Sequence, residues 1–129
     1  MNEKKHETKG EYGEVHKGFE ETNQKKTLCI KKNIKQPKIR LEREIEIAKL
    51  MIPKNDENLL QVYDVFVENS VTYIVSEWCN GGTLSQYLKS KCKINEDEAI
   101  EIMRQVMRSY RQLYELNSCL LYTSDAADE

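Results

Sequence analysis

Several short stretches of the first 80 residues have the composition of β-strands, and in 27–32 apolar and polar residues alternate with a period of two. In this stretch Lys31 lies on the face opposite Leu28 and Ile30. Asn69 and Ser70 separate the last two stretches, which therefore predict an antiparallel hairpin. The predicted strands, with a polar connector at 20–26 after the first, are 14–19, 27–32, 59–68 and 71–78.

Two longer segments instead repeat their apolar residues every three or four positions, as helices do. The first is 37–52, and the second begins after Asn95 and carries one stripe of Ala99, Met103, Val106, Tyr110 and Leu113. Between them, Thr83 followed by Gln86 predicts a capping box for a short helix. The order of strands, one helix, a hairpin and further helices predicts an α+β fold with an antiparallel sheet rather than βαβ units.

One acidic residue of the first helical segment lies on its apolar side. At about 100° per residue, the apolar residues of 37–52 form one arc, and Glu44 falls inside it. A carboxylate facing a core is costly unless a cation pairs with it, and Lys31 is the natural partner. Alternatively, Arg40 and Glu44 could form an ordinary surface pair four residues apart. The spacing leaves both interpretations open.

Composition narrows the classes of function. The chain has 129 residues and a formal net charge of −2, which suits one modest domain. No basic stripe is present, which argues against nucleic acid as a partner. No signal peptide or membrane segment is recognisable, so we expect a cytoplasmic protein. The four cysteines are far apart without a CxxC pair, so we expect neither a metal site nor disulfides.

The stretch TKGEYGEV at 8–15 contains two glycines, Gly10 and Gly13. Glycine tolerates positive φ and lets a ligand approach the backbone closely, so this loop could join two strands or cover phosphate groups. A dinucleotide-binding turn and a GxxxxGK[ST] loop both open a helix. A strand-like segment follows here, which excludes both of those loop types.

Together these features resemble the N-terminal half of a eukaryotic-type protein kinase domain of the serine/threonine type. Four motifs that stand in order and at suitable spacing are far more specific than a glycine loop alone. They are TKGEYGEV at 8–15 for the Gly-rich loop with Thr8 at its first glycine, LCIK at 28–31 for VAIK, REI at 43–45 for the helix-C glutamate, and YIVSEWCNGGTL at 73–84 for the hinge. EDEAIEIMRQV at 96–106 looks like helix E, and the similarity covers about 8–118.

The resemblance implies a kinase-like N-lobe at 1–78 and a hinge with the start of a C-lobe at 79–118. It implies ATP as the cofactor, with Mg²⁺ in the full-length family, and makes Lys31 and Glu44 the catalytic pair, in which Glu44 holds Lys31 against the α- and β-phosphates. The implied ATP-binding residues are Gly10, Glu11, Tyr12, Gly13, Val15, Lys31, Glu77, Cys79 and Thr83.

Individual roles follow from the same resemblance. Val15 would cover the adenine, Ser76 would take the gatekeeper position, and backbone groups of Glu77 and Cys79 would bond the adenine edge. Thr83 would lie near the ribose, although its capping role explains it equally well. For Trp78 we prefer hinge packing to a ligand contact.

The sequence departs from the family at both ends. Residues 1–7 have no apolar residue besides the first, so we expect a poorly formed first strand. The His-Arg-Asp loop should fall near 120–122, where the chain has Leu-Leu-Tyr, and the metal-binding Asp-Phe-Gly is missing as well. Residues 119–129, CLLYTSDAADE, resemble a translated adapter from DNA library preparation, so we expect a non-native tail, with a divergent natural tail as the alternative.

We therefore expect a fragment of an ATP-dependent serine/threonine protein kinase. Its nucleotide-binding lobe would be present, and it would be inactive as a lone chain because the catalytic and metal-binding loops are missing. A protein would be the substrate of the full-length parent. The alternative is a non-catalytic kinase-like binding or regulatory module.

Overall fold

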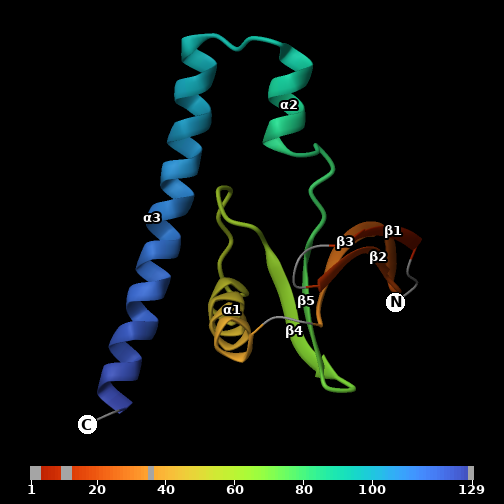
Figure 1. Cartoon of the computed structure of the whole chain (residues 1–129), viewed down its shortest axis with the longest axis vertical. Helices are drawn as coiled ribbons and strands as arrows, with labels where there is room; N and C mark the ends of the chain where they lie inside the picture. The colour runs from red at the N-terminus through yellow and green to blue at the C-terminus, as the bar shows by residue number, and fades with distance from the viewer. Residues whose placement is uncertain (1–3, 10–12, 35–36, 128–129) are drawn as a thin grey trace. The chain divides into compact units, whose positions relative to one another are not determined.

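The structure is a computed structural model that describes residues 4–9, 13–34 and 37–127, with the backbone alone for 4–9 and 119–127. The chain divides into two compact units, Met1–Trp78 and Cys79–Glu129. The first unit holds the sheet and one helix, and the second holds two helices (Figure 1). This is the α+β arrangement that the order of the predicted elements indicated.

The first unit is built on a five-stranded antiparallel sheet with the strand order β1-β2-β3-β5-β4. Helix α1, Lys38–Met51, connects β3 to β4 and packs along β4 (Figure 1). The strands are β1 (Lys4–Lys9), β2 (Gly13–Glu20), β3 (Asn23–Asn33), β4 (Val62–Glu68) and β5 (Val71–Glu77).

The N-terminal strands differ from the sequence pattern in two ways. β1 pairs with β2 although its residues are polar, with a register irregularity between Lys4 and Thr8. The predicted polar connector at 20–26 is wrong in extent, because β2 continues to Glu20 and β3 already begins at Asn23. Backbone hydrogen bonds extend the β2–β3 hairpin beyond the core of the sheet. The side chains there are exposed and polar, so apolar and polar residues do not alternate and the sequence gives no sign of a strand.

The second hairpin joins β4 and β5 through the two-residue turn Asn69-Ser70. Both turn residues have positive φ, 50° and 64°, as a type I′ hairpin requires. The predicted start of β4 at Leu59 is too early, since its N–H donates to the Asp56 carbonyl in a turn at 3.2 Å. Leu59 is apolar and its side chain is buried, although it lies before the strand, and this led the sequence pattern to place the start of β4 too early.

The core of the first unit lies between α1 and the sheet. Ala48 of α1, Val62 of β4 and Ile74 of β5 form its buried centre. The partly buried residues packed against this centre are Met51, Ile52 and Val65. The apolar arc predicted from the helical period therefore faces the sheet, which places Glu44, inside that arc, toward the sheet as well.

The second unit contains α2, Leu84–Lys91, and α3, Glu96–Ala127. The predicted capping box is confirmed: the Thr83 hydroxyl accepts from the Gln86 N–H at 3.1 Å, and the Gln86 side-chain oxygen accepts from the Thr83 N–H at 2.9 Å. Helix α3 continues through residues 119–127, within the stretch that we expected to be non-native.

The two helices are linked near the turn that joins them. The Tyr87 hydroxyl donates a hydrogen bond to a carboxylate oxygen of Glu98, and this carboxylate raises the pKa of Tyr87. Along α3 the predicted stripe is exposed at Met103, Val106, Tyr110 and Leu113. No described helix combines the length and the apolar character that crossing a membrane requires.

Candidate functional site

Lys31 lies on the central strand β3, between β2 and β5. Its direct partners are Val15 on β2 and Ile74 on β5. Directly paired residues of antiparallel strands project to the same face, so these three side chains share one face of the sheet. Leu28 and Ile30 occupy the other face, as the alternation predicted.

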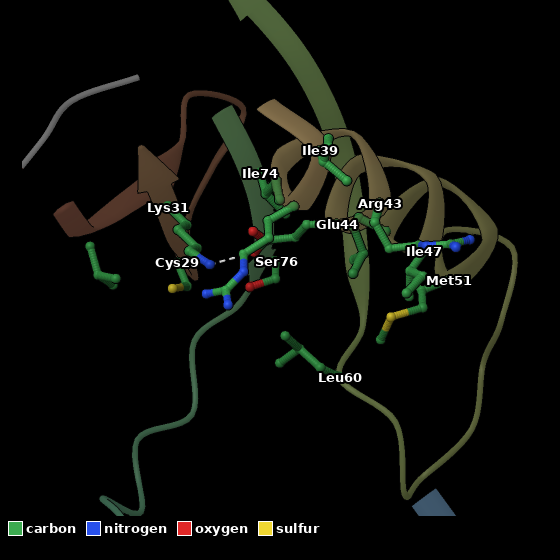
Figure 2. Close-up of a pocket in the computed structure, with 14 residues that line it drawn as sticks. Cys29, Lys31, Ile39, Arg43, Glu44, Ile47, Met51, Leu60, Ile74 and Ser76 are labelled. Atoms are coloured by element: carbon green, nitrogen blue, oxygen red, sulfur yellow. Dashed lines mark hydrogen bonds and ion pairs between the residues drawn. The ribbon is translucent and has the colours of Figure 1, made fainter. Parts of the chain in front are cut away.

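Glu44 reaches this face from α1. The Lys31 ammonium donates to a carboxylate oxygen of Glu44, and this contact is both a hydrogen bond and an ion pair (Figure 2). The Lys31 side chain is 39% exposed and the Glu44 side chain 27%. The pair is therefore partly hydrated, which lowers the cost of placing two charges beside an apolar core. Pairing with Lys31 explains the inward position of Glu44.

A cavity of about 740 Å³ opens between α1 and this face of the sheet, within the size range of small-molecule sites. Cys29 and Ser76 flank Lys31 at one end, and Met51 and Leu60 lie at the other (Figure 2). The lining residues are Val15, Cys29, Lys31, Ile39, Arg40, Arg43, Glu44, Ile47, Ala48, Met51, Leu60, Val62, Ile74 and Ser76.

The charges around the cavity favour an anion. Three cationic side chains line it, those of Lys31, Arg40 and Arg43, against the single carboxylate of Glu44. Arg43 also lies 4.0 Å from the carboxylate of Glu46, an exposed contact that adds little. Cationic groups beside low-dielectric walls concentrate anions, and an apolar cavity of this size can hold a flat organic group next to them.

The predicted glycine loop is only partly described. Gly10, Glu11 and Tyr12 lie outside the described residues. Gly13 begins β2, and a Cβ atom added there would lie 2.1 Å from the carbonyl oxygen of Lys32. Only glycine therefore fits at this position, where β2 and β3 lie close together. Val15, two residues further on, lines the cavity.

The remaining predicted binding residues lie in the segment that the family resemblance led us to expect as the hinge. Glu77 ends β5, and its backbone N–H donates to the Gln61 carbonyl at 2.9 Å, while its carboxylate accepts from the Gln61 N–H at 3.0 Å. It does not line the cavity. Cys79 and Thr83 belong to the second unit, where both are exposed and Thr83 caps α2. The structure thus brings together Val15, Lys31 and Glu44 of the predicted set.

Sequence reasoning missed part of the lining. Arg40 precedes Glu44 by one helical turn, so the helical period already places it near the Glu44 side of α1. The same period puts Arg43 about 100° away from Glu44, on the side that we expected to carry surface charges, yet Arg43 also lines the cavity. Leu60 was assigned to a strand, although it lies in the segment before β4. Within the part of the chain that the structure describes, no group of three or more His, Cys, Asp or Glu side chains is arranged to hold a metal ion.

Solved structures establish the class of fold. The chain is similar to the crystal structure of Rad53 1–466 in complex with AMP-PNP, with a TM-score of 0.70 and 22% sequence identity. The match covers 84% of this chain and 28% of that one. At this identity the likeness concerns the fold alone.

The sequence comparison then gives the family. The model of the protein kinase domain matches residues 2–122, and the chain belongs to that family. It is 32% identical over 109 residues to the probable serine/threonine-protein kinase zyg-1 of Caenorhabditis briggsae, a match that covers 84% of this chain and 15% of that protein. It is 36% identical over 100 residues to calcium-dependent protein kinase 5 of Plasmodium falciparum, covering 76% of this chain and 17% of the relative.

A further relative matches a shorter stretch. The serine/threonine-protein kinase unc-51 of Caenorhabditis elegans is 40% identical over 67 residues, which are 52% of this chain and 8% of the relative. The chain thus spans about 15% of the length of the first curated relatives that it matches. Their names identify these relatives as protein kinases, several of them explicitly of the serine/threonine type.

Proposed function

We propose that this chain is the nucleotide-binding lobe of an ATP-dependent serine/threonine protein kinase whose parent phosphorylates a protein in the cytoplasm. One observation carries the proposal: Lys31 and Glu44 are paired at the wall of a cavity with predominantly cationic polar groups. In a kinase such a pair holds the lysine against the α- and β-phosphates. Membership of the kinase family supports this assignment.

We propose a role for each residue around the cavity of the first unit. Val15 contacts the base from β2, and Cys29 and Ser76 form the wall beside it. Lys31 binds the phosphates while Glu44 fixes the position of its ammonium group. In the hinge segment, backbone groups of Glu77 and Cys79 would bond the base, and Thr83 would contact the ribose. Gly10 to Gly13 would supply backbone N–H donors to the phosphates.

The proposed role of this chain leaves out two steps of phosphoryl transfer: positioning the acceptor hydroxyl and binding Mg²⁺. The 129 residues contain neither His-Arg-Asp nor Asp-Phe-Gly, the motifs that position the acceptor hydroxyl and Mg²⁺ in kinases. We therefore propose nucleotide binding without phosphoryl transfer for the lone chain. The Mg²⁺ that accompanies ATP in this family would find its usual protein ligands elsewhere in a longer parent.

The test is a binding titration of a fluorescent ATP analogue, mant-ATP with Mg²⁺, against the chain and three variants. Lys31→Met should weaken binding by about 10- to 100-fold, because a hydrogen bond to a charged group contributes about 1.5–3 kcal/mol. Glu44→Gln should produce a smaller loss, since the lysine remains but is less well positioned.

The matched control is Lys32→Met. Lys32 neighbours Lys31 but projects to the opposite face, where its ammonium lies 6.0 Å from the Tyr73 ring centroid. Its replacement should leave the affinity for mant-ATP unchanged. Equal affinities of the Lys31 and Lys32 variants would refute the proposed role of the cavity.

A further inference from the structure

Lys17 and Trp78 make a contact that none of the proposed roles uses. The Lys17 ammonium lies 5.2 Å from the centroid of the Trp78 ring, within the distance of about 6 Å at which a cation is attracted to an aromatic face. Tryptophan is the most favourable ring for this interaction. Both residues are half-buried, so solvent screens the contact less than it would at a fully exposed site.

The strand register fixes the face of the sheet from which Lys17 projects. Lys17 on β2 pairs with Cys29 on β3, and Cys29 pairs with Ser76 on β5. Directly paired residues share a face, and both Cys29 and Ser76 line the cavity. The Lys17 side chain therefore leaves the sheet on the cavity side, two residues from Val15.

The contact joins strands that are not neighbours. β3 lies between β2 and β5, and two strand spacings amount to about 10 Å. Lys17 must therefore extend past the Cys29 position of β3 to reach Trp78, which directly follows the last residue of β5. No hydrogen bond of the sheet ladder can make this connection, because each ladder joins adjacent strands only.

We propose that Lys17 is a positioning residue for the nucleotide: its contact with Trp78 holds β2, and with it Val15, at a fixed height above the end of β5. A flat base gains dispersion energy only where both walls touch it, and a strand free to lift away would lose one wall. The inference rests on the proposed function and adds to it a residue pair that sets the affinity for the base.

A second cation–π contact in the same sheet provides a matched control. The Lys26 ammonium lies 4.1 Å from the Tyr63 ring centroid, and neither residue lines the cavity. Removing the Lys26 charge therefore costs the sheet a similar contact, together with an ion pair to Glu20 at the end of β2, 3.4 Å long and five residues from Val15. Any effect specific to the nucleotide site should distinguish the two lysines.

The experiment measures mant-ATP affinity and Trp78 emission for the full chain and for Lys17→Met, Lys17→Arg and Lys26→Met. Trp78 is the only tryptophan of the sequence, so the emission excited where tyrosine does not absorb comes from Trp78 and reports on the surroundings of its ring. Lys17→Met should weaken binding by about three- to tenfold and alter the Trp78 spectrum. Lys17→Arg should restore affinity to within about twofold, since arginine keeps the cation, and Lys26→Met should change neither readout.

The outcomes separate this inference from the proposed function. If Lys31→Met weakens binding as expected while Lys17→Met binds as well as Lys26→Met, the proposed function stands and the inference is overturned. Failure of Lys17→Arg to restore binding also overturns it, because packing of the stem rather than the charge would then matter. No binding by the unmodified chain overturns both. If melting curves show that Lys17→Met unfolds, Lys17→Gln takes its place.

Discussion

Replacing Gly13 with alanine tests the close approach of β2 and β3 at the end of the proposed phosphate loop, where β2 begins. The new Cβ would lie 2.1 Å from the Lys32 carbonyl oxygen and 3.1 Å from the carbonyl carbon. Both atoms belong to the backbone, so no side-chain rotation relieves the overlap and the strands must move apart. We expect the loss of about two ladder hydrogen bonds, at about 1 kcal/mol each. Alanine also restricts the unfolded chain, which regains about 0.5–1 kcal/mol. The predicted net destabilisation is therefore about 1–1.5 kcal/mol.

Gly18→Ala is the matched control on the same strand. Its Cβ would lie 2.8 Å from the Cδ1 atom of Ile30, the mobile end of a side chain. A rotamer adjustment of Ile30 costs about 0.5–1.5 kcal/mol. Alanine in place of glycine also lowers the conformational entropy of the unfolded chain, and this stabilisation largely offsets that cost. Urea denaturation followed by circular dichroism gives both free energies of unfolding. A Gly13→Ala protein as stable as Gly18→Ala would refute the close strand approach.

Two further predictions concern the core and the helical unit. Val62 is 2% exposed, so Val62→Ala removes two buried methyl groups and leaves an empty space, which should lower the free energy of unfolding by about 2 kcal/mol. Val67 lies on the same strand but is 66% exposed, so Val67→Ala should have almost no effect. Urea denaturation of both variants measures the difference. Glu98 raises the pKa of Tyr87, so the α2–α3 link should be intact below about pH 10, the ordinary tyrosine pKa, and be lost as pH rises further. Tyrosinate absorbance of Glu98→Gln should therefore show one tyrosine ionising at lower pH than in the unmodified chain; superimposable titration curves would contradict this.

The sequence predicted the structure best where buried residues recur at the spacing of a regular element, every second residue in a strand or every three to four residues in a helix. Leu28, Ile30 and Lys31 alternate across β3 as expected, and Ala48 faces the core because α1 is amphipathic at the helical period. The position of Glu44 followed from the same argument. A costly carboxylate on an apolar face predicted a cation opposite it, and the structure supplies Lys31.

Features held by the backbone or by two distant side chains were not visible in the pattern. β1 and the extended β2–β3 hairpin form from polar residues, because their stabilisation comes from ladder hydrogen bonds. The contact between Lys17 and Trp78 depends on the strand order, which places β3 between their strands. No local pattern encodes that order, so the sequence suggested hinge packing or a ligand contact for Trp78 and gave no sign of Lys17.

The Asn69-Ser70 turn has an influence well beyond its own two residues. Because side chains alternate along a strand, sliding β4 by one position against β5 would turn Val62 outward and bring Tyr63 inward. A turn that admits only two residues with positive φ sets the alignment of Asp64–Glu68, and the register irregularity between Val62 and Asp64 then brings Val62 to the cavity wall. A single inserted residue at this tip would thus change what a ligand meets without altering any residue that touches it.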